Sequence, residues 1–309
     1  MTTPVRICVV GSANMDLTFR TPRLPRVGET LAGSAFHTGF GGKGANQAVM
    51  AARLGARVSF IARLGNDAFG QESLRHYRTE GIDAAFIHID EQHSSGVAAI
   101  LVDDSARNCI LVVPGANAAL SPVDVREDAP AIRSANVVLG QLEVPLGTIM
   151  AAFQEARLAN VRTILNPAPA MELPDELLRL TDLCVPNETE IEALTGQRAD
   201  SLDYAATAAR SLQQRGARSV LVTLGERGAL LLENDEVVPI PAVLVNAVDP
   251  TGAGDAFIGS LAVFWAEGLS LREAARRANA VAALTVSRLG TQTAFPSRVE
   301  AEAFLALGN

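Results

Sequence analysis

Strand-length apolar runs alternate with amphipathic helical segments through most of this chain. The apolar runs cover residues 5–10, 58–62, 137–139, 162–165, 183–185 and 220–223. Most of them precede segments with helical periodicity, at residues 44–54, 145–159, 188–195 and 203–215. This alternation predicts an α/β fold with a central, mostly parallel sheet flanked by helices.

Two regions interrupt the alternation. Residues 16–40 and 96–113 contain consecutive short strands and turns with no helix between them. We expect them to form a small β-sheet of their own, a sub-domain built from two insertions at approximately residues 14–40 and 95–114 of a single domain that spans residues 1–309. Such a sheet could act as a lid or as a dimer surface. The alternative is an antiparallel edge of the main sheet.

Composition narrows the classes of partner. The chain has 309 residues, 48% of them apolar, and a formal net charge of −8 with both signs interspersed. Because phosphate-rich polymers would be repelled, we expect no nucleic-acid partner. The first apolar run is too short for a signal peptide or a membrane-spanning helix, so we expect no membrane partner.

The cysteines and histidines give no sign of a metal centre. Cys8, Cys109 and Cys184 stand singly in apolar runs, which is typical of buried thiols in a reducing compartment, and we expect a cytoplasmic protein. The four histidines show no ligand spacing, and we interpret them as surface or packing residues.

The stretch VDPTGAGDAFIGSLAVF at residues 248–264 places four small residues directly before Asp255 and an apolar helix. The unpaired amides of residues 252–255 and the helix dipole would form a site for an anion, with phosphate the expected occupant. Asp255 would suit a base that removes a proton from an attacking hydroxyl. Taken alone, the stretch also fits a turn with an N-cap.

The loop HTGFGGKGANQAVMAARLG at residues 37–55 contains G-x-G-x-x-G, with Asp67 near the spacing of a dinucleotide fingerprint. A nicotinamide oxidoreductase would rest on this match alone, and the polar segment before it does not resemble a buried strand. The loop is not a Walker A motif either, because glycine follows its lysine. We interpret it as a tight loop that carries Lys43 and Asn46 into a site.

GSANMD, residues 11–16, follows the first predicted strand, where open parallel sheets bind ligands. Asn14 and Asp16 would share one face of an extended segment. A carboxylate beside an amide can hold the neighbouring hydroxyls of a sugar. An Asx turn is the structural alternative.

Together these motifs resemble the ribokinase family of carbohydrate kinases. The similarity covers essentially the whole chain, in order, through GSANMD, GGKGANQA, LNPAP, PNETE, TLGERG and DPTGAGDAF. It implies ATP-dependent phosphorylation of a pentose, D-ribose at its 5-hydroxyl, giving D-ribose 5-phosphate.

The resemblance also implies residue roles at the reacting centre. Asp255 would be the base, and the amides of Gly252, Ala253 and Gly254 would neutralise the phosphoryl group during transfer. The sugar would be bound by Asp255 together with Asn14, Asp16, Gly42, Lys43, Asn46 and Glu143.

Further positions match nucleotide and metal sites of the family. Those for ATP are Asn187, Thr223, Leu224, Gly225, Glu226, Arg227, Gly228, Gly254 and Asn279. Glu190, with Asn187, would organise Mg²⁺ through water, as magnesium often keeps its waters. An activating K⁺ would be held by Asp249 and by carbonyls of Thr251, Thr285, Arg288, Gly290 and Ala294. Relatives carry Ser where this chain has Ala294, so one hydroxyl is missing.

The resemblance leaves two alternatives to a ribose kinase. A 2-deoxyribose kinase would share nearly all these motifs, and a non-catalytic sugar-binding regulator would keep GSANMD without needing Asp255. The two insertions fit the lid of the family, which often pairs with the lid of a second subunit, so we expect a homodimer.

Overall fold

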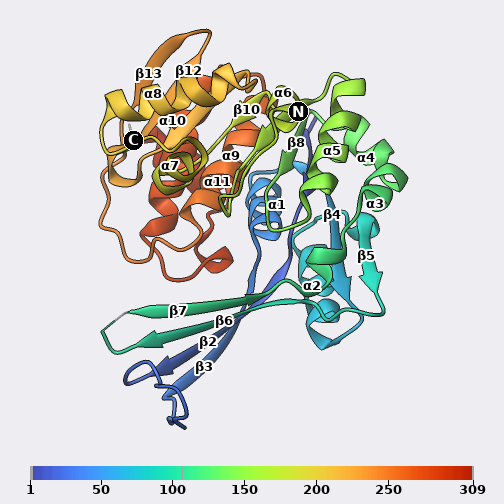
Figure 1. Cartoon of the computed structure of the whole chain (residues 1–309), viewed down its shortest axis with the longest axis vertical. Coiled ribbons are helices and arrows are strands. Elements are labelled where there is room, and N and C mark those ends of the chain that lie inside the picture. The colour runs from blue at the N-terminus through green and yellow to red at the C-terminus, as the bar shows by residue number, and fades with distance from the viewer. Residues whose placement is uncertain (1–2, 106, 308–309) are drawn as a thin grey trace.

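The computed structural model describes residues 3–105 and 107–307. Its main sheet has nine strands in the order β13-β12-β11-β10-β9-β8-β1-β4-β5 (Figure 1). Their bounds are β1 Arg6–Val10, β4 Arg57–Gly65, β5 Ile87–Asp90, β8 Val137–Gly140, β9 Arg162–Leu165, β10 Leu183–Cys184, β11 Ser219–Thr223, β12 Ala229–Glu233 and β13 Glu236–Ile240. The strands from β5 to β11 pair in parallel, and β12 and β13 add an antiparallel edge.

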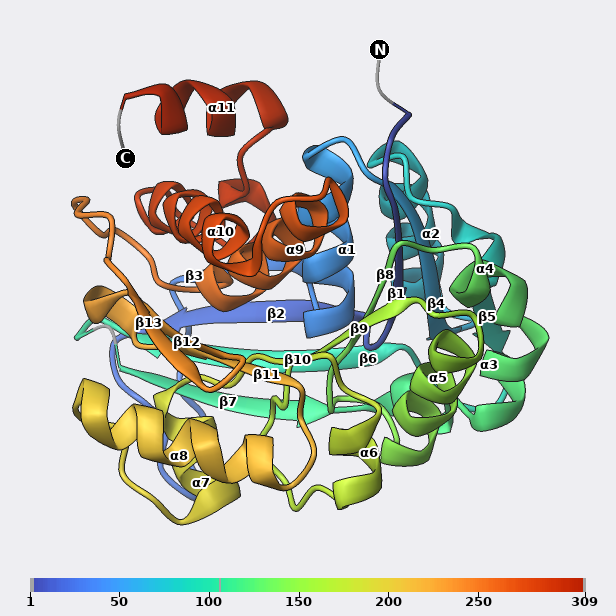
Figure 2. The ribbon, with the colours of Figure 1, turned by 90° about the horizontal axis from the view of Figure 1, so that it is seen from above.

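Helices cover both faces of the main sheet, as Figure 2 shows. In β1, Ile7 and Val9 pack in one apolar core, whereas Cys8 and Val10 pack in the other, because successive side chains of a strand point to opposite faces. The first core includes residues of α1 Lys43–Arg53, α2 Ala68–Thr79, α9 Ala253–Ala266, α10 Leu271–Val286 and α11 Arg298–Ala306. The second includes residues of α3 Pro122–Glu127, α4 Ala129–Arg133, α5 Leu146–Leu158, α6 Asp175–Arg179, α7 Glu188–Thr195 and α8 Leu202–Gln214.

A four-stranded sheet in the order β3-β2-β6-β7 extends away from the main body (Figure 1). It consists of β2 Asn14–Thr21, β3 Ala35–Gly41, β6 Gly96–Asp103 and β7 Asn108–Val113. Two antiparallel hairpins, β2 with β3 and β6 with β7, join through a parallel pairing of β2 with β6. We call this the small sheet.

The predicted fold class is confirmed: a mostly parallel sheet lies between helices, and the small sheet is separate from it rather than an edge of it. The prediction that all three cysteines are buried is wrong for Cys109, although Cys8 and Cys184 are buried. Cys109 lies on β7, an edge strand whose six residues are all exposed. Its apolar run therefore reflects strand composition and not burial.

None of the helices in the described ranges is both long enough and apolar enough to cross a membrane.

Candidate active site

Polar residues gather at the carboxyl ends of the parallel strands, where open α/β sheets bind ligands. Asn14 and Glu143 come shortly after β1 and β8, Asn166 follows β9, and Thr223 ends β11. A cavity of about 200 Å³ opens at this edge. Its lining combines side chains of several elements: Lys43, Asn166, Val185, Asn187, Glu190, Thr223, Gly252, Gly254, Asp255 and Ile258.

Helix α9 supplies Asp255 from its first turn. Gly252 is the N-cap and has a φ of 78°, a left-handed conformation that glycine adopts without strain. The amide of Ala253 donates to the Pro250 carbonyl at 3.2 Å, so one of the three predicted anion-binding amides is used in the turn. Among the described residues we find no acceptor for the amides of Gly252 and Gly254, which line the cavity.

Asp255 is buried and accepts hydrogen bonds on both carboxylate oxygens. Asn46 Nδ2 donates to Oδ2 at 2.9 Å, and Gln47 Nε2 donates to Oδ1 at 3.0 Å. Burial raises the pKa of Asp255, while Lys43 and these two hydrogen bonds oppose the rise in its pKa. The result is a carboxylate held in a fixed orientation beside the cavity.

Lys43 is the only lysine in the chain. Burial by itself would lower the pKa of its ammonium group, but the carboxylates of Asp255, Glu143 and Glu190 outweigh burial and raise this pKa. Lys43 therefore stays cationic and supplies positive charge at the cavity, where acidic groups surround it.

Asp16 and Glu143 form the acidic side of the site. Burial raises the pKa of Asp16 to about 7, and the charges of Glu143 and Asp255 add to this effect. Glu143 accepts hydrogen bonds from the hydroxyl of Ser12 and from the amide of Lys43. A neutral or hydrogen-bonded Asp16 suits contact with uncharged hydroxyl groups.

Tight turns bring these residues together. Gly42 has a φ of 86°, and a Cβ on Gly44 would lie 2.6 Å from the amide nitrogen of Ser12. Only glycines let α1 begin so close to the segment after β1. On that segment, Asn14 Oδ1 accepts a hydrogen bond of 2.8 Å from Asn117 Nδ2, which fixes the Asn14 amide.

The residues expected to bind a nucleotide lie along one rim of the cavity and beyond it. Asn187 and Thr223 form an isolated parallel bridge, and Gly225–Arg227 follow as a 3₁₀ helix, η3. Arg227 pairs with Glu188, and Gly228 has a φ of 87° at the end of this turn. Asn279, on α10, donates to the Pro241 carbonyl at 2.7 Å and does not line the cavity.

Asn187 and Glu190 form a reciprocal cap at the start of α7. Asn187 Oδ1 accepts from the Glu190 amide at 2.8 Å, and Glu190 Oε2 accepts from the Asn187 amide at 2.8 Å. Each carboxylate oxygen of Glu190 thus accepts one hydrogen bond from Asn187, because Oε1 accepts from Asn187 Nδ2. Glu190 also lines the cavity, and a carboxylate held in this way suits a metal that keeps its waters.

Asp249, one of the residues expected to hold a monovalent cation, connects the loop before α9 to the segment after α10. Asp249 accepts hydrogen bonds from the amides of Thr251 at 2.9 Å and Gly290 at 3.0 Å. The Asp249 amide donates to the Val286 carbonyl at 3.1 Å, which brings the loop to the end of α10 beside Thr285. The carbonyl of Thr285 accepts from the Arg288 amide, and Ala294 is buried in the short helix η4, Gln292–Ala294. These oxygen donors are of the kind that hard cations prefer.

Comparison with known proteins assigns the chain to a family. The pfkB family carbohydrate kinase model matches residues 5–298. The chain belongs to the pfkB family of carbohydrate kinases. It is an ATP-dependent sugar kinase, as the motifs predicted.

Relatives of known activity align with this pfkB kinase over nearly its whole length. A deoxyribokinase of Salmonella typhi is 41% identical over 302 residues, which are 97% of this chain and 99% of the relative. A ribokinase of Mus musculus is 41% identical over 295 residues, 94% of this chain and 91% of the relative. The structure of Arabidopsis thaliana ribokinase complexed with ribose and ATP has a TM-score of 0.94 at 32% identity, and the match covers 98% of this chain and 99% of that one.

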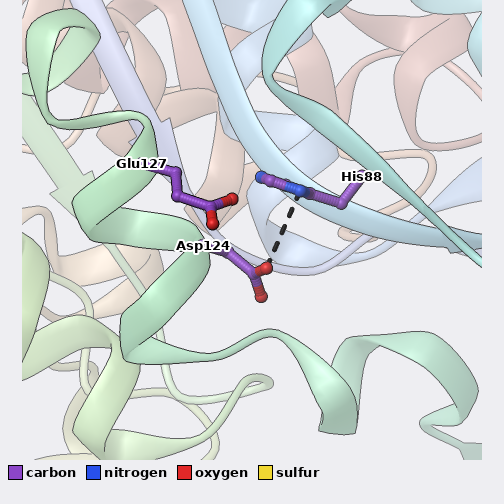
Figure 3. A group of neighbouring side chains, drawn as sticks. All are labelled: His88, Asp124 and Glu127. Carbon is purple, nitrogen blue, oxygen red and sulfur yellow. Dashed lines mark ion pairs between the residues drawn. The ribbon is translucent and has the colours of Figure 1, made fainter.

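Outside the cavity, His88, Asp124 and Glu127 form the one group of metal-ligating side chains found among the described residues of this pfkB kinase (Figure 3). Two of the three are already engaged: Asp124 Oδ1 accepts from Arg63 at 2.7 Å, and His88 Nε2 lies 2.8 Å from Asp128. We therefore interpret His88 and Asp124 as part of an ion-pair network with Asp128 and Arg63.

Sequence reasoning missed the side chains that surround the predicted base. Gln47, Asn166 and Gln292 are buried and hydrogen-bonded around Asn46 and Asp255. Gln47 and Asn166 lie inside the motifs GGKGANQA and LNPAP, whereas Gln292 lies in the loop after α10. Amides within otherwise small or apolar motifs were the available signal.

Proposed function

We propose that this kinase transfers the γ-phosphoryl group of ATP to the 5-hydroxyl of D-ribose. The observation that carries the proposal is the buried carboxylate of Asp255, beside a cavity that also receives Lys43 and the amino terminus of α9. The ribokinase names of its relatives support a pentose substrate. The alternative within the family is 2-deoxyribose, supported by the deoxyribokinase relative.

In the proposed mechanism Asp255 accepts the proton of the 5-hydroxyl as its oxygen attacks the γ-phosphorus, and ADP leaves with the electrons of the broken P–O bond. The free amides at the start of α9 and the ammonium of Lys43 stabilise the negative charge on the phosphoryl oxygens. Most of the acceleration comes from positioning and charge, as in phosphoryl transfer generally.

We propose that Asn14, Asp16, Gly42, Asn46 and Glu143 hold the sugar. Asp16 and Glu143 face the same acidic side of the site, and their oxygens can accept hydrogen bonds from sugar hydroxyls. The segment from Thr223 to Gly228, with Asn279 of α10, would bind the nucleotide. Thr223 lines the cavity, and Gly225 and Gly228 adopt positive φ angles in the turn that follows it.

The metals are proposed on the fit of their residues. Glu190 would hold Mg²⁺ through water, and bound magnesium would supply charge neutralisation of the ATP phosphates. Asp249, with the carbonyls of Thr251, Thr285, Arg288, Gly290 and Ala294, would hold K⁺. Since Asp249 already fixes the loop before α9, a cation there would order the anion-binding amides.

We further propose a cytoplasmic homodimer, one domain per chain, in which the small sheet covers the sugar and pairs with that of a second copy. The free thiols of Cys8 and Cys184 suit a reducing compartment. Exposed apolar side chains on β7, among them Leu111, support a covered face.

The experiment that tests the substrate measures ADP release with D-ribose and with 2-deoxy-D-ribose, at saturating magnesium and with potassium or sodium. A higher kcat/KM for ribose, increased by potassium over sodium, supports the proposal. A preference for deoxyribose would reassign the substrate and leave the mechanism in place, whereas equal rates in both salts would remove the cation site.

A further inference from the structure

The side-chain amide of Asn46, which faces Asp255 Oδ2, is itself hydrogen-bonded to the side-chain amide of Gln292. Gln292 Nε2 donates to Asn46 Oδ1 at 2.9 Å, and Asn46 Nδ2 donates to the carboxylate at 2.9 Å. His76 Nε2 lies 2.8 Å from Gln292 Oε1. These side chains form a continuous relay from α2 through η4 and α1 to α9.

The relay has a direction. A side-chain amide donates only from its nitrogen and accepts only at its oxygen. Because Gln292 donates to the oxygen of Asn46, the NH₂ group of Asn46 must face Asp255. His76 fixes the orientation of Gln292 in the same way. When the ring N–H of His76 donates to Gln292 Oε1, the NH₂ group of Gln292 is left to donate to Asn46.

Gln292 is itself held rigidly. Its side chain is buried, and Arg53 donates to its carbonyl oxygen and to that of Phe295. His76 stacks face to face on Phe40 of β3, with ring centroids 3.9 Å apart and planes 1° apart. The relay therefore connects the base of the small sheet with the carboxylate.

A shorter relay of the same kind serves the other carboxylate oxygen. Gln141 Nε2 donates to Gln47 Oε1 at 2.7 Å, and Gln47 Nε2 donates to Asp255 Oδ1 at 3.0 Å. Two donors thus approach one buried carboxylate from fixed directions. This geometry fixes the orientation of the carboxylate, and each bond favours its charged form.

We propose that Gln292 is a positioning residue for the reaction, acting on Asp255 through Asn46. The inference rests on the proposed role of Asp255 as the base. Without Gln292, the Asn46 amide is free to turn its oxygen toward the carboxylate, which repels it and leaves Asp255 misdirected.

The test is Gln292→Met, which keeps the length of the side chain and removes both hydrogen bonds. We expect kcat to fall about tenfold, the scale of one hydrogen bond to a charged group, while the KM for ATP changes less than about twofold. Gln154→Met, on the exposed surface of α5, is the matched control and should change neither. An unchanged kcat in Gln292→Met would overturn the proposal.

A double-mutant cycle with Asn46→Ala separates positioning from a general structural effect. If Gln292 acts through Asn46, adding Gln292→Met to Asn46→Ala lowers kcat no further. A full additional tenfold loss would overturn the proposal. Recovery of the single variant at high potassium would overturn it too, because Gln292 would then act through the neighbouring cation loop.

His76→Phe provides a second variant should Gln292→Met not fold. It keeps the ring beside Phe40 and removes the hydrogen bond to Gln292, so kcat should fall in the same direction; an unchanged value contradicts the relay. Asp255→Asn is assayed in parallel. If that variant keeps full turnover, the base itself is misassigned, whereas a loss in Asp255→Asn without one in Gln292→Met refutes only the relay.

Discussion

At the scale of single residues, the site concentrates more negative than positive charge. Glu143, Glu190 and Asp255 hold the ammonium of Lys43 in its charged form, and Asp16 adds a further carboxyl group near Glu143 and Asp255. Burial raises the pKa of both carboxyl groups, but Lys43 and two amide donors oppose the rise at Asp255, whereas acidic neighbours add to it at Asp16, whose pKa rises to about 7. The two carboxyl groups therefore suit different tasks, one as base and one as hydrogen-bonding partner of a sugar.

Asp255→Asn should lower kcat by about 100-fold or more, because the amide cannot accept the proton of the attacking hydroxyl. The Kd for ATP, measured by calorimetry, should stay within about threefold of the parent value. This is a small change, because a tenfold change in Kd corresponds to about 1.4 kcal/mol. Turnover equal to that of the parent would remove Asp255 from the mechanism.

Asp16→Asn should stabilise the ligand-free protein in a pH-dependent way. The folded-state pKa of Asp16 is raised to about 7 from 3.8, so ionisation of this carboxyl costs stability as pH rises between those values. Replacement by the neutral amide removes that cost. We expect little difference from the parent near pH 4 and a gain at pH 8 of at most about 4 kcal/mol, at about 1.4 kcal/mol per pKa unit.

Denaturant unfolding of both proteins from pH 4.5 to pH 8 checks this expectation. A gain in the free energy of unfolding that is constant across this pH range would show that ionisation of Asp16 does not lower stability. The same variant should bind the sugar more weakly, since an amide offers one acceptor where the carboxylate offers two.

At the scale of elements, α1 carries much of the site. Lys43, Asn46 and Gln47 all project from its first turns, and its start is pressed against the segment that follows β1. The helix is also buried against α9, so the donors and the carboxylate they hold belong to packed helices and not to loops. Because these helices are packed together, the carboxylate of Asp255 is held in place before any substrate binds.

Gly44→Ala should disturb this junction. An added Cβ would meet backbone atoms of Gly11 and Ser12 at 2.6 to 2.8 Å, so the helix must shift. We expect a loss of about 1–3 kcal/mol in the free energy of unfolding, the usual cost of overpacking, together with reduced kcat.

Gly147→Ala is the matched control, because its Cβ on α5 meets only Pro122 at 3.8 Å. That variant should change stability by less than about 1 kcal/mol and leave kcat unaltered. Equal effects of both substitutions would contradict the close approach at Gly44.

The sequence predicted secondary-structure elements better than contacts between residues far apart in the chain. Hydrophobic periodicity located six of the parallel strands but not β5, and it placed a helix at residues 188–195, the bounds of α7, because burial imposes those periods locally. The burial predicted for Cys109 was wrong, because an apolar strand has the same sequence pattern whether or not another layer covers it. The bond from Gln292 to Asn46 joins residues 246 positions apart, a pairing that no local pattern encodes.

At the scale of the whole molecule, the small sheet has two unequal faces. The register places Phe36, Phe19, Leu101 and Cys109 in one row across the sheet, with Leu111 on the same face. Asp16 points to the opposite face, since it is an odd number of residues from Phe19. In the proposed dimer, the face without Asp16 would meet the second copy and the face with Asp16 would cover the sugar.

Leu111→Glu should convert the proposed homodimer to a monomer, because it places a charge on the apolar face. Sedimentation equilibrium measures the change. Ile110→Glu, next along β7 and on the Asp16 face, is the control and should leave the dimer intact. A parent protein that sediments as a monomer, or a dimer in Leu111→Glu, would contradict the proposed interface.

Because Lys43 is the single lysine of the chain, cleavage after lysine can report when the site opens. An endoproteinase that cuts only after lysine has one target in the chain, the bond between Lys43 and Gly44, at the junction of the small sheet and α1. Cleavage there requires that this junction open, because a protease binds an extended segment. The rate at which two fragments appear would time that opening directly, and a bound sugar or nucleotide that holds the junction closed would slow it.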